Sequence, residues 1–415
     1  MRAFKSIKQN YQSSPEILAL LEDFRLMVND CIRIGLEFEK ENHRYPSMKK
    51  LSILCYGELK KYRVYSPYRL TAISKAAGIL SARKKSIKRG YHTRRPYVSK
   101  SLLVSCYSVK VQDKRLRVQL GGRRFEYIPL NNHTLQILSE PDLRVNAFTL
   151  TNNYVSISIS KEVDAMSESV TNAIGIDRNL RNLAVGNDEK ITFYDMRKAV
   201  EIAENTVHVV GSFKRNDTRI RKIISSKYGR RRSERVRQII HRVTKRVVQE
   251  AKANRQAIVF EDIGGINKLY RKGNGRGRRF RGMMNSWSFN EVKRQVEYTA
   301  AWEGVPVLTL SKRETNGTTM DCPRCGERLQ VPVRGDLEHE RQLWCEKCEK
   351  WMDRDVVAVL NISRRGRVRF ARSLSEGEAA EAVKGNAEHE GEPLILRVDA
   401  SKPWSRISPG KIAEP

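Results

Sequence analysis

The sequence predicts an α/β fold for residues 173–363, preceded by a helical region and a small antiparallel β region. Three observations lead to this prediction. After residue 173, short apolar runs typical of buried strands alternate with amphipathic helical stretches, as they do in α/β layers. Residues 14–88 carry apolar side chains at helical spacing, and residues 101–161 alternate apolar and polar side chains between turn-forming stretches.

The helical region comes first along the chain. Apolar residues recur near helical spacing from Leu18 to Leu36, with charged residues between them. A second stretch, residues 66–90, continues the pattern and ends in a basic cluster closed by Gly90, a residue typical of helix C-termini. We therefore expect helices over most of residues 14–88.

The β region follows. "SVKVQDKRLRVQL" and "NYVSISISKE" alternate apolar and polar residues, and "QDKR", "GGRR" and "TNN" supply turns. This pattern predicts a small antiparallel sheet.

The α/β region begins with a strand at residues 173–177, which we expect to form a hairpin with residues 183–185. "ITFYD" predicts a third strand, and an amphipathic helix is expected at about residues 233–254. "AIVFEDIGG" predicts a buried strand that ends at Glu261, and a helix at residues 286–304 leads to the strand "VPVLTLS".

The charge of the chain indicates its class of partner. Lys and Arg total 79 against 47 Asp and Glu, so the formal net charge is +32 and the pI is about 10.0. Such a surplus is typical of proteins that bind a polyanion; nucleic acid is the first candidate and an anionic membrane the second. No uninterrupted apolar run approaches the ~18 residues of a membrane span, and no signal-peptide pattern is evident. We expect an intracellular protein in a reducing compartment.

Carboxylates lie at the edges of three apolar segments. Asp177 and Glu261 each end a predicted strand, and Asp353 and Asp355 both precede an apolar helix face. Strand ends and a helix start can meet at one edge of a sheet, where oxygen ligands favour Mg²⁺. Two such ions would suit hydrolysis of a phosphodiester. The alternative is that these are ordinary turn or cap residues.

Four cysteines have the spacing of a metal site. Cys322 and Cys325 form one CxxC pair, and Cys345 and Cys348 form another after nineteen intervening residues. Two such knuckles supply four thiolates to a tetrahedral zinc ion and leave no open position, so a structural zinc is predicted. A redox-active CxxC or a chance pairing is the alternative.

Basic side chains indicate where nucleic acid would bind. One set would lie on the polar face of the helix near residue 240, where a merely solvated face is the alternative interpretation; a second set lies in the Arg/Gly-rich stretch 271–282, expected to be a mobile loop. The candidates are Arg230, Arg231, Arg232, Arg235, Arg242 and Arg246 in the helix and Arg276, Arg278 and Arg279 in the loop.

The motifs "GIDRNLRNLAVGND", "IVFEDIGGI", "NSWSFNEVKRQVEYTAAWEGVPVLTLS" and "TTMDCPRCG…CEKC…DRDVVAVLNIS" occur in that order and resemble TnpB, the transposon-encoded RNA-guided nuclease family related to miniature type V CRISPR effectors. The resemblance covers about residues 173–363. It implies a RuvC-type, RNase H-like fold with an Asp–Glu–Asp metal site at Asp177, Glu261 and Asp355, the last of these being preferred to Asp353. The chain has Val357 where the family usually has Asn, and the spacing between its cysteine pairs is long for the family.

With this resemblance, the expected organisation has seven parts. They are the start of a β-barrel-like wedge region (1–13), a helical recognition region (14–100), the β wedge region (101–172), a RuvC-like core (173–314), a zinc-binding insertion (315–352), a last RuvC-like segment (353–370) and an acidic, disordered tail (371–415).

The resemblance implies a metal-dependent, RNA-guided DNA endonuclease with two Mg²⁺ ions and one structural Zn²⁺. It also implies a cytoplasmic, nucleoid-associated protein of a prokaryote. Its partners would be a guide RNA from the transposon end and double-stranded target DNA beside a short adjacent motif, with the protein acting as a monomer or homodimer. The alternatives are an RNA-guided repressor that does not cleave, a DNA transposase, or a relative that works within a CRISPR system.

Overall fold

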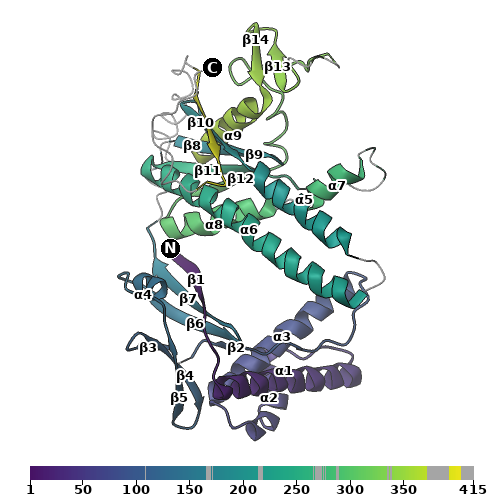
Figure 1. Ribbon diagram of the computed structural model, residues 1–415, viewed down its shortest axis with the longest axis vertical. Coiled ribbons are helices and arrows are strands. Elements are labelled where there is room, and N and C mark those ends of the chain that lie inside the picture. The colour runs from purple at the N-terminus through teal and green to yellow at the C-terminus, as the bar shows by residue number, and fades with distance from the viewer. Residues whose placement is uncertain are drawn as a thin grey trace. The chain divides into compact units, whose positions relative to one another are not determined.

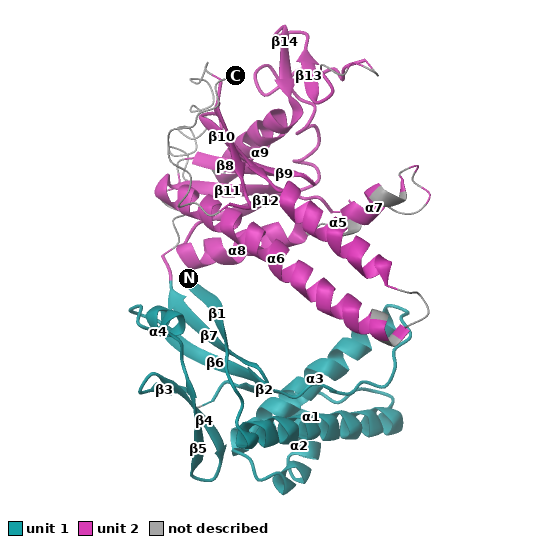
Figure 2. Cartoon of the chain, in the orientation of Figure 1, with its two compact units in different colours: residues 1–162 teal, residues 163–415 magenta. Residues whose placement is uncertain are grey.

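A computed structural model of the chain describes residues 1–402 except 108, 165–169, 171, 214–217, 265, 267–272, 274, 276, 287–288, 334–335, 337–338 and 372–391. The chain divides into two compact units, residues 1–162 and 163–415 (Figure 2).

The first unit contains the helical region expected from the sequence. Its elements are α1 (Pro15–Asn42), α2 (Met48–Cys55), the short 3-10 helix η1 (Glu58–Lys61) and α3 (Ser66–Lys88) (Figure 1). The Ser14 side chain accepts a hydrogen bond from the Ile17 amide and so caps α1. The buried face of α1 includes Leu21, Phe24 and Val28, which explains the helical spacing of its apolar residues.

The first unit also contains two antiparallel sheets. The larger has the order β1 (Arg2–Asn10), β7 (Tyr154–Glu162), β6 (Arg144–Thr151) and β2 (Leu102–Ser105); the smaller joins β3 (Lys110–Gln112), β4 (Arg115–Gly121) and β5 (Arg124–Pro129). A short helix that the sequence analysis did not predict, α4 (Asn132–Leu138), is capped by the Asn131 side chain.

The second unit is built on a six-stranded sheet. Its order is β12 (Val307–Leu310), β11 (Gln256–Glu261), β8 (Asn172–Arg178), β9 (Asn182–Gly186), β10 (Lys190–Asp195) and β15 (Leu394–Asp399). The strands β8, β9 and β10 form an antiparallel meander, whereas β11 pairs in parallel with β8 and β12 in parallel with β11. The α/β region and the hairpin at its start are therefore as the sequence predicts.

Helices cover both faces of this sheet (Figure 1). Ile174 and Ile176 of β8 pack in one core with α5 (Arg197–Ser212), α6 (Thr218–Ala253) and α8 (Phe289–Glu303). The opposite face, which includes Ala173, Ala257 and Val259, packs against α9 (Arg354–Ala371). Because side chains alternate along a strand, Asp177 and Glu261 point to the α9 face of the sheet.

The second unit differs from the sequence-based expectations in three places. Helix α6 begins at Thr218 rather than near residue 233. Its first turns carry Ile220 and Ile223 at helical spacing, but these side chains are exposed rather than buried in a core, so this part of the helix was missed. Part of the expected Arg/Gly loop is a helix, α7 (Arg278–Ser286).

The third difference concerns the acidic tail, where the predicted disorder is wrong for Leu394–Asp399. This segment forms β15, which pairs in parallel with β10, and Ala400 is fully buried after it. The apolar residues of "LILRV" provide the pairing strand, although an acidic, apolar-poor stretch precedes them. The rest of the predicted tail, 372–391 and 403–415, lies outside the described residues.

Among the helices that the structure describes, none combines the length and apolar character needed to cross a membrane.

Candidate active site and metal centre

Asp177 and Glu261 lie at the same edge of the central sheet. Strands β8 and β11 run in parallel, and their last paired residues are Ile176 and Phe260. The next residue of each strand is Asp177 or Glu261, so the two carboxylates are neighbours on the α9 face. Arg178 ties the strand ends together, because its guanidinium donates to the Glu261 backbone carbonyl at 2.7 Å.

Asp355 reaches this edge from the start of α9. The helix crosses β8 closely at Gly175, where a Cβ would lie only 2.4 Å from the Val359 carbonyl oxygen. The Ser363 hydroxyl also donates to the Ala173 carbonyl at 2.7 Å. These contacts hold the second and third turns of α9 against β8 and so bring Asp355, in the first turn, toward the end of this strand.

The Asp353 side chain caps the N-terminus of α9. Its carboxylate accepts hydrogen bonds from the Asp355 amide at 2.8 Å and the Val356 amide at 3.2 Å. These are the contacts of a helix N-cap. The cap explains why Asp353, although only two residues away, is the weaker candidate for a metal ligand.

The three carboxylates influence one another electrostatically. Burial, together with the charges of Glu261 and Asp355, raises the pKa of Asp177 to about 7, although the hydrogen bond from Asn179 opposes this shift. Burial also raises the pKa of Glu261, opposed by the charge of Arg178. A cluster of buried carboxylates that repel one another is an environment that a divalent cation would stabilise.

Polar side chains complete the site. Asn179 donates to Asp177 at 2.6 Å, and Asn182 donates to Asp355 at 3.2 Å. The Arg341 guanidinium donates to both Asp355 carboxylate oxygens, at 2.8 and 2.7 Å. Arg341 is half exposed, whereas the Asp355 side chain is 3% exposed, so a surface cation reaches a buried carboxylate.

The ligand chemistry of this site fits Mg²⁺, a cation that prefers carboxylate oxygens and retains water. Among the described residues, only the four cysteines bring three or more ligand atoms within 4.8 Å of one another, so the three carboxylates are spread more widely.

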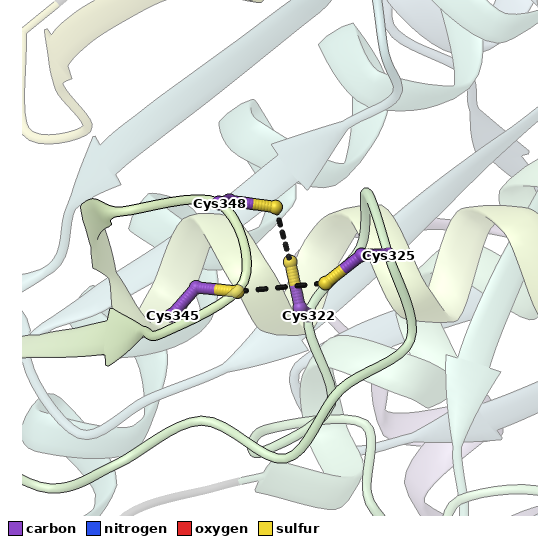
Figure 3. Close-up of side chains that lie close together, drawn as sticks. All are labelled: Cys322, Cys325, Cys345 and Cys348. Atoms are coloured by element: carbon purple, nitrogen blue, oxygen red, sulfur yellow. Dashed lines mark hydrogen bonds between the residues drawn. The ribbon is translucent and has the colours of Figure 1, made fainter.

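The four cysteines form a compact cluster beside this site (Figure 3). The Sγ atoms of Cys322 and Cys348 are 3.8 Å apart, and those of Cys325 and Cys345 are 3.5 Å apart. Cys322 and Cys325 lie in a turn closed by the hydrogen bond from the Gly326 amide to the Cys322 carbonyl. Cys345 ends β13 (Gln342–Cys345), and Cys348 lies in the turn before β14 (Lys350–Asp353). Four thiols in this arrangement can hold a structural zinc ion. The predicted cysteine site is therefore supported by the geometry.

The chain is similar in sequence to a known domain family and to two TnpB-like proteins. The family model described as "Cas12f1-like, TNB domain" matches residues 289–362, which include the four cysteines and Asp355. A TnpB-like protein of Methanocaldococcus jannaschii is 29% identical over 206 residues, covering 46% of this chain and 67% of that protein. A second TnpB-like protein of the same organism is 22% identical over 365 residues, covering 84% of this chain and 81% of that protein. This chain is a relative of TnpB.

A solved structure supports the same fold for this TnpB relative. The chain matches a protein in the cryo-EM structure of the Cas12f1–sgRNA–target DNA complex with a TM-score of 0.58 and 14% identity, covering 84% of this chain and 82% of that one. The predicted resemblance to TnpB and the miniature type V effectors is thus confirmed, and the TnpB relative shares the Cas12f1 fold with a zinc-ribbon-like cysteine cluster.

Val357 marks a difference between this TnpB relative and the usual family motif. It is fully buried and packs in one core with Cys322, Leu329 and Leu343. The side chain therefore joins the start of α9 to the interior of the cysteine-bearing segment, a contact that an Asn side chain could not make without burying an amide.

The predicted nucleic-acid-binding arginines have different surroundings. Arg230, Arg231 and Arg235 are exposed on α6 and Arg232 is partly exposed. Arg242 donates to the Ser401 carbonyl at 2.9 Å and Arg246 pairs with Glu250, so both already have partners within the chain. Arg278 and Arg279 begin α7, and Arg276 lies outside the described residues. For all nine, nucleic-acid binding stays a prediction.

Sequence reasoning missed Arg341 and Asn182, the two side chains that contact Asp355. Arg341 precedes β13 by one residue, within the long stretch between the cysteine pairs, and nothing in its neighbourhood marks it as a site residue. The hairpin "GIDRNLRN" does contain Asn182, five residues after Asp177. Asn182 reaches Asp355 only because α9 packs against the sheet, and this packing is not evident from the sequence.

Proposed function

We propose that this TnpB relative is an RNA-guided DNA endonuclease with an RNase H-like, RuvC-type core. The observation that carries the proposal is the convergence of Asp177, Glu261 and Asp355, from β8, β11 and α9, at one edge of the central sheet. An antiparallel meander of three strands followed by two parallel strands is the sheet arrangement that we expect of this core.

In the proposed mechanism, Asp177, Glu261 and Asp355 would hold two Mg²⁺ ions. When bound, the ions would supply an activated water and stabilise the leaving oxygen of the phosphodiester. Asn179 and Asn182 hold the carboxylates of Asp177 and Asp355 in place through their hydrogen bonds. Arg341 balances the charge of Asp355 before the ions bind and provides a cation next to the phosphate of the substrate.

The proposed partners are a guide RNA and a target DNA. The Cas12f1 protein with the same fold was solved with an sgRNA and target DNA. The net charge of +32 provides the attraction that two polyanionic partners need. In this division of labour the protein reads a short DNA motif, and base pairing with the RNA reads the remaining sequence.

The proposal is tested by purifying the chain expressed with its flanking genomic DNA and sequencing the RNA that accompanies it. A discrete, structured RNA that extends past the boundary of the gene is the expected result. Heterogeneous cellular RNA that is removed by salt would mean that the positive charge binds any polyanion, and the guided function would lose its support.

A further inference from the structure

One surface of the first unit is strongly basic and is not part of the proposed active site. From Ser66 to Gln112 the chain contains no Asp or Glu. Eight basic residues lie between positions 81 and 100, at the end of α3 and in the segment that follows it. They are Arg83, Lys84, Lys85, Lys88, Arg89, Arg94, Arg95 and Lys100. We call residues 90–101 the basic segment.

The basic segment has no regular secondary structure, yet its backbone is held at several points. The Tyr91 amide donates to the Ser86 carbonyl at 3.1 Å. Asn29 of α1 binds both backbone groups of Val98, accepting from its amide at 2.7 Å and donating to its carbonyl at 3.0 Å. Arg25 also donates to that carbonyl, at 3.3 Å. Hydrogen bonds therefore anchor the segment at Tyr91 and at Val98, the residue after Tyr97.

Two side chains of the basic segment are aromatic rings that are largely exposed to solvent. Tyr91 is 67% exposed and Tyr97 is 75% exposed, the latter being the most exposed tyrosine among the described residues. Pro96 stiffens the backbone directly before Tyr97. Arg94 and Arg95, between the two tyrosines, are exposed as well.

We propose that the basic segment binds unpaired nucleotides of the guide RNA, with Tyr91 and Tyr97 stacking on bases and Arg94 and Arg95 contacting phosphates. Rings that stack on splayed bases, next to cations that follow the backbone, are the usual means of recognising single-stranded RNA. A duplex offers no free base face to an exposed ring. The identity of the RNA as a guide rests on the proposed function, but the binding itself does not.

The test measures binding of the full chain to a fluorescein-labelled 12-nucleotide oligouridine and to a 12-base-pair RNA duplex at about 0.15 M salt. In the variant with both Tyr91→Ala and Tyr97→Ala, we expect affinity for oligouridine to fall at least about tenfold, since stacking is lost. Duplex affinity should stay within about twofold. Tyr91→Phe with Tyr97→Phe retains the rings and should bind like the original chain. Tyr127→Ala, on a less exposed tyrosine of the same unit, is the matched control.

Salt dependence separates the stacking rings from the phosphate-binding arginines. Removing both rings should leave the slope of log affinity against log salt unchanged. Arg94→Gln with Arg95→Gln should reduce that slope by about 0.7 for each phosphate that the segment no longer neutralises. With 5-iodouridine in the RNA, photocrosslinks should map to the peptide that contains Tyr91 and Tyr97.

Three results would overturn the proposal: unchanged oligouridine binding in the double alanine variant, an equal loss for the duplex, or a larger loss for oligo(dT), which would assign the surface to a DNA strand. The assay contains neither target DNA nor divalent cation, so it measures RNA binding alone. A chain that never cleaves DNA could therefore still satisfy this test, so its outcome is distinguishable from that of the nuclease proposal.

Discussion

Among single residues, Asp177 shows how the sequence pattern and the structure complement each other. A carboxylate directly after "AIGI" could be a strand-end turn residue or a ligand. In the structure Asp177 is only 7% exposed and lies beside Glu261 and Asp355. Its negative charge is unfavourable there without a counter-ion. The sequence could identify the residue, but only the tertiary fold reveals its two charged neighbours.

The raised pKa of Asp177 predicts how stability depends on pH without divalent metal. Between its unfolded value near 4 and its folded value of about 7, the folded chain keeps a proton that the unfolded chain releases. Stability should therefore fall as pH rises through this window, by up to about 1.4 kcal/mol per pH unit, and then level off. Asp177→Asn should remove this loss, so that its melting temperature exceeds that of the original chain at pH 8.

The measurement is thermal unfolding from pH 4 to pH 8 with and without Mg²⁺. Added Mg²⁺ should reverse the order of the two proteins at pH 8, because only the original chain has the full ligand set. If Asp177→Asn were less stable than the original chain at pH 8 without metal, the electrostatic description of the site would be incorrect.

The contact between Arg341 and Asp355 gives a second prediction for a single side chain. Arg341→Gln leaves a buried carboxylate without its cation, so we expect a loss of about 2 kcal/mol in the free energy of unfolding without metal. Saturating Mg²⁺ should shrink this loss by taking over the charge. Arg328→Gln, which removes a 3.5 Å surface pair with Asp321, is the control and should change stability by less than about 0.5 kcal/mol. A loss that is equal with and without Mg²⁺ would speak against a metal at Asp355.

At the scale of elements, the regular parts were predictable and the close packing was not. Apolar runs predicted β8, β9, β11 and β12, because buried strands need continuous apolar side chains. Strand β15 was not predicted, because its six residues follow a long acidic stretch and are too few to show a clear strand pattern. The crossing of α9 over β8 at Gly175 was also not predictable, because it depends on two segments almost two hundred residues apart.

The crossing at Gly175 can be tested directly. In Gly175→Ala the new Cβ would lie 2.4 Å from the Val359 carbonyl and 2.8 Å from the Ser363 amide nitrogen, so α9 must move away from the sheet. We expect a loss of about 1–3 kcal/mol in stability and a fall in DNA cleavage much larger than this loss explains, because Asp355 moves with the helix. Gly229→Ala, in α6 with no atom within 4 Å of the new Cβ, is the control and should be neutral or stabilising.

The cysteine-bearing segment gives a prediction for metal removal. Elemental analysis should find one zinc ion per chain, and Cys345→Ser should lose it. Because Val357 of α9 packs in the same core as the cysteines, zinc loss should also loosen the first turn of α9 and weaken Mg²⁺ binding. Hydrogen exchange of residues 342–357 would report this loosening. If exchange in α9 were unchanged after zinc removal, the two metal centres would be independent.

For the whole molecule, charge and motif order indicated the class of partner and the likeness to TnpB, and the comparisons confirmed that likeness. Net charge describes the chain as a whole and cannot assign individual arginines. Arg242 and Arg246 show this limit, since both belong to the predicted nucleic-acid face and both have partners within the chain. The seven-part organisation stays a prediction, although the chain does divide into two units after residue 162.

The central claim is that three carboxylates from β8, β11 and α9 form one nuclease site. The most direct measurement is cleavage of a matched DNA target by the chain with its co-purified RNA, with and without Mg²⁺, compared with Asp177→Asn, Glu261→Gln and Asp355→Asn. Our account predicts Mg²⁺-dependent cleavage that falls by at least about a hundredfold in each variant, with RNA affinity unchanged. Undiminished cleavage in any one of the three variants would contradict it.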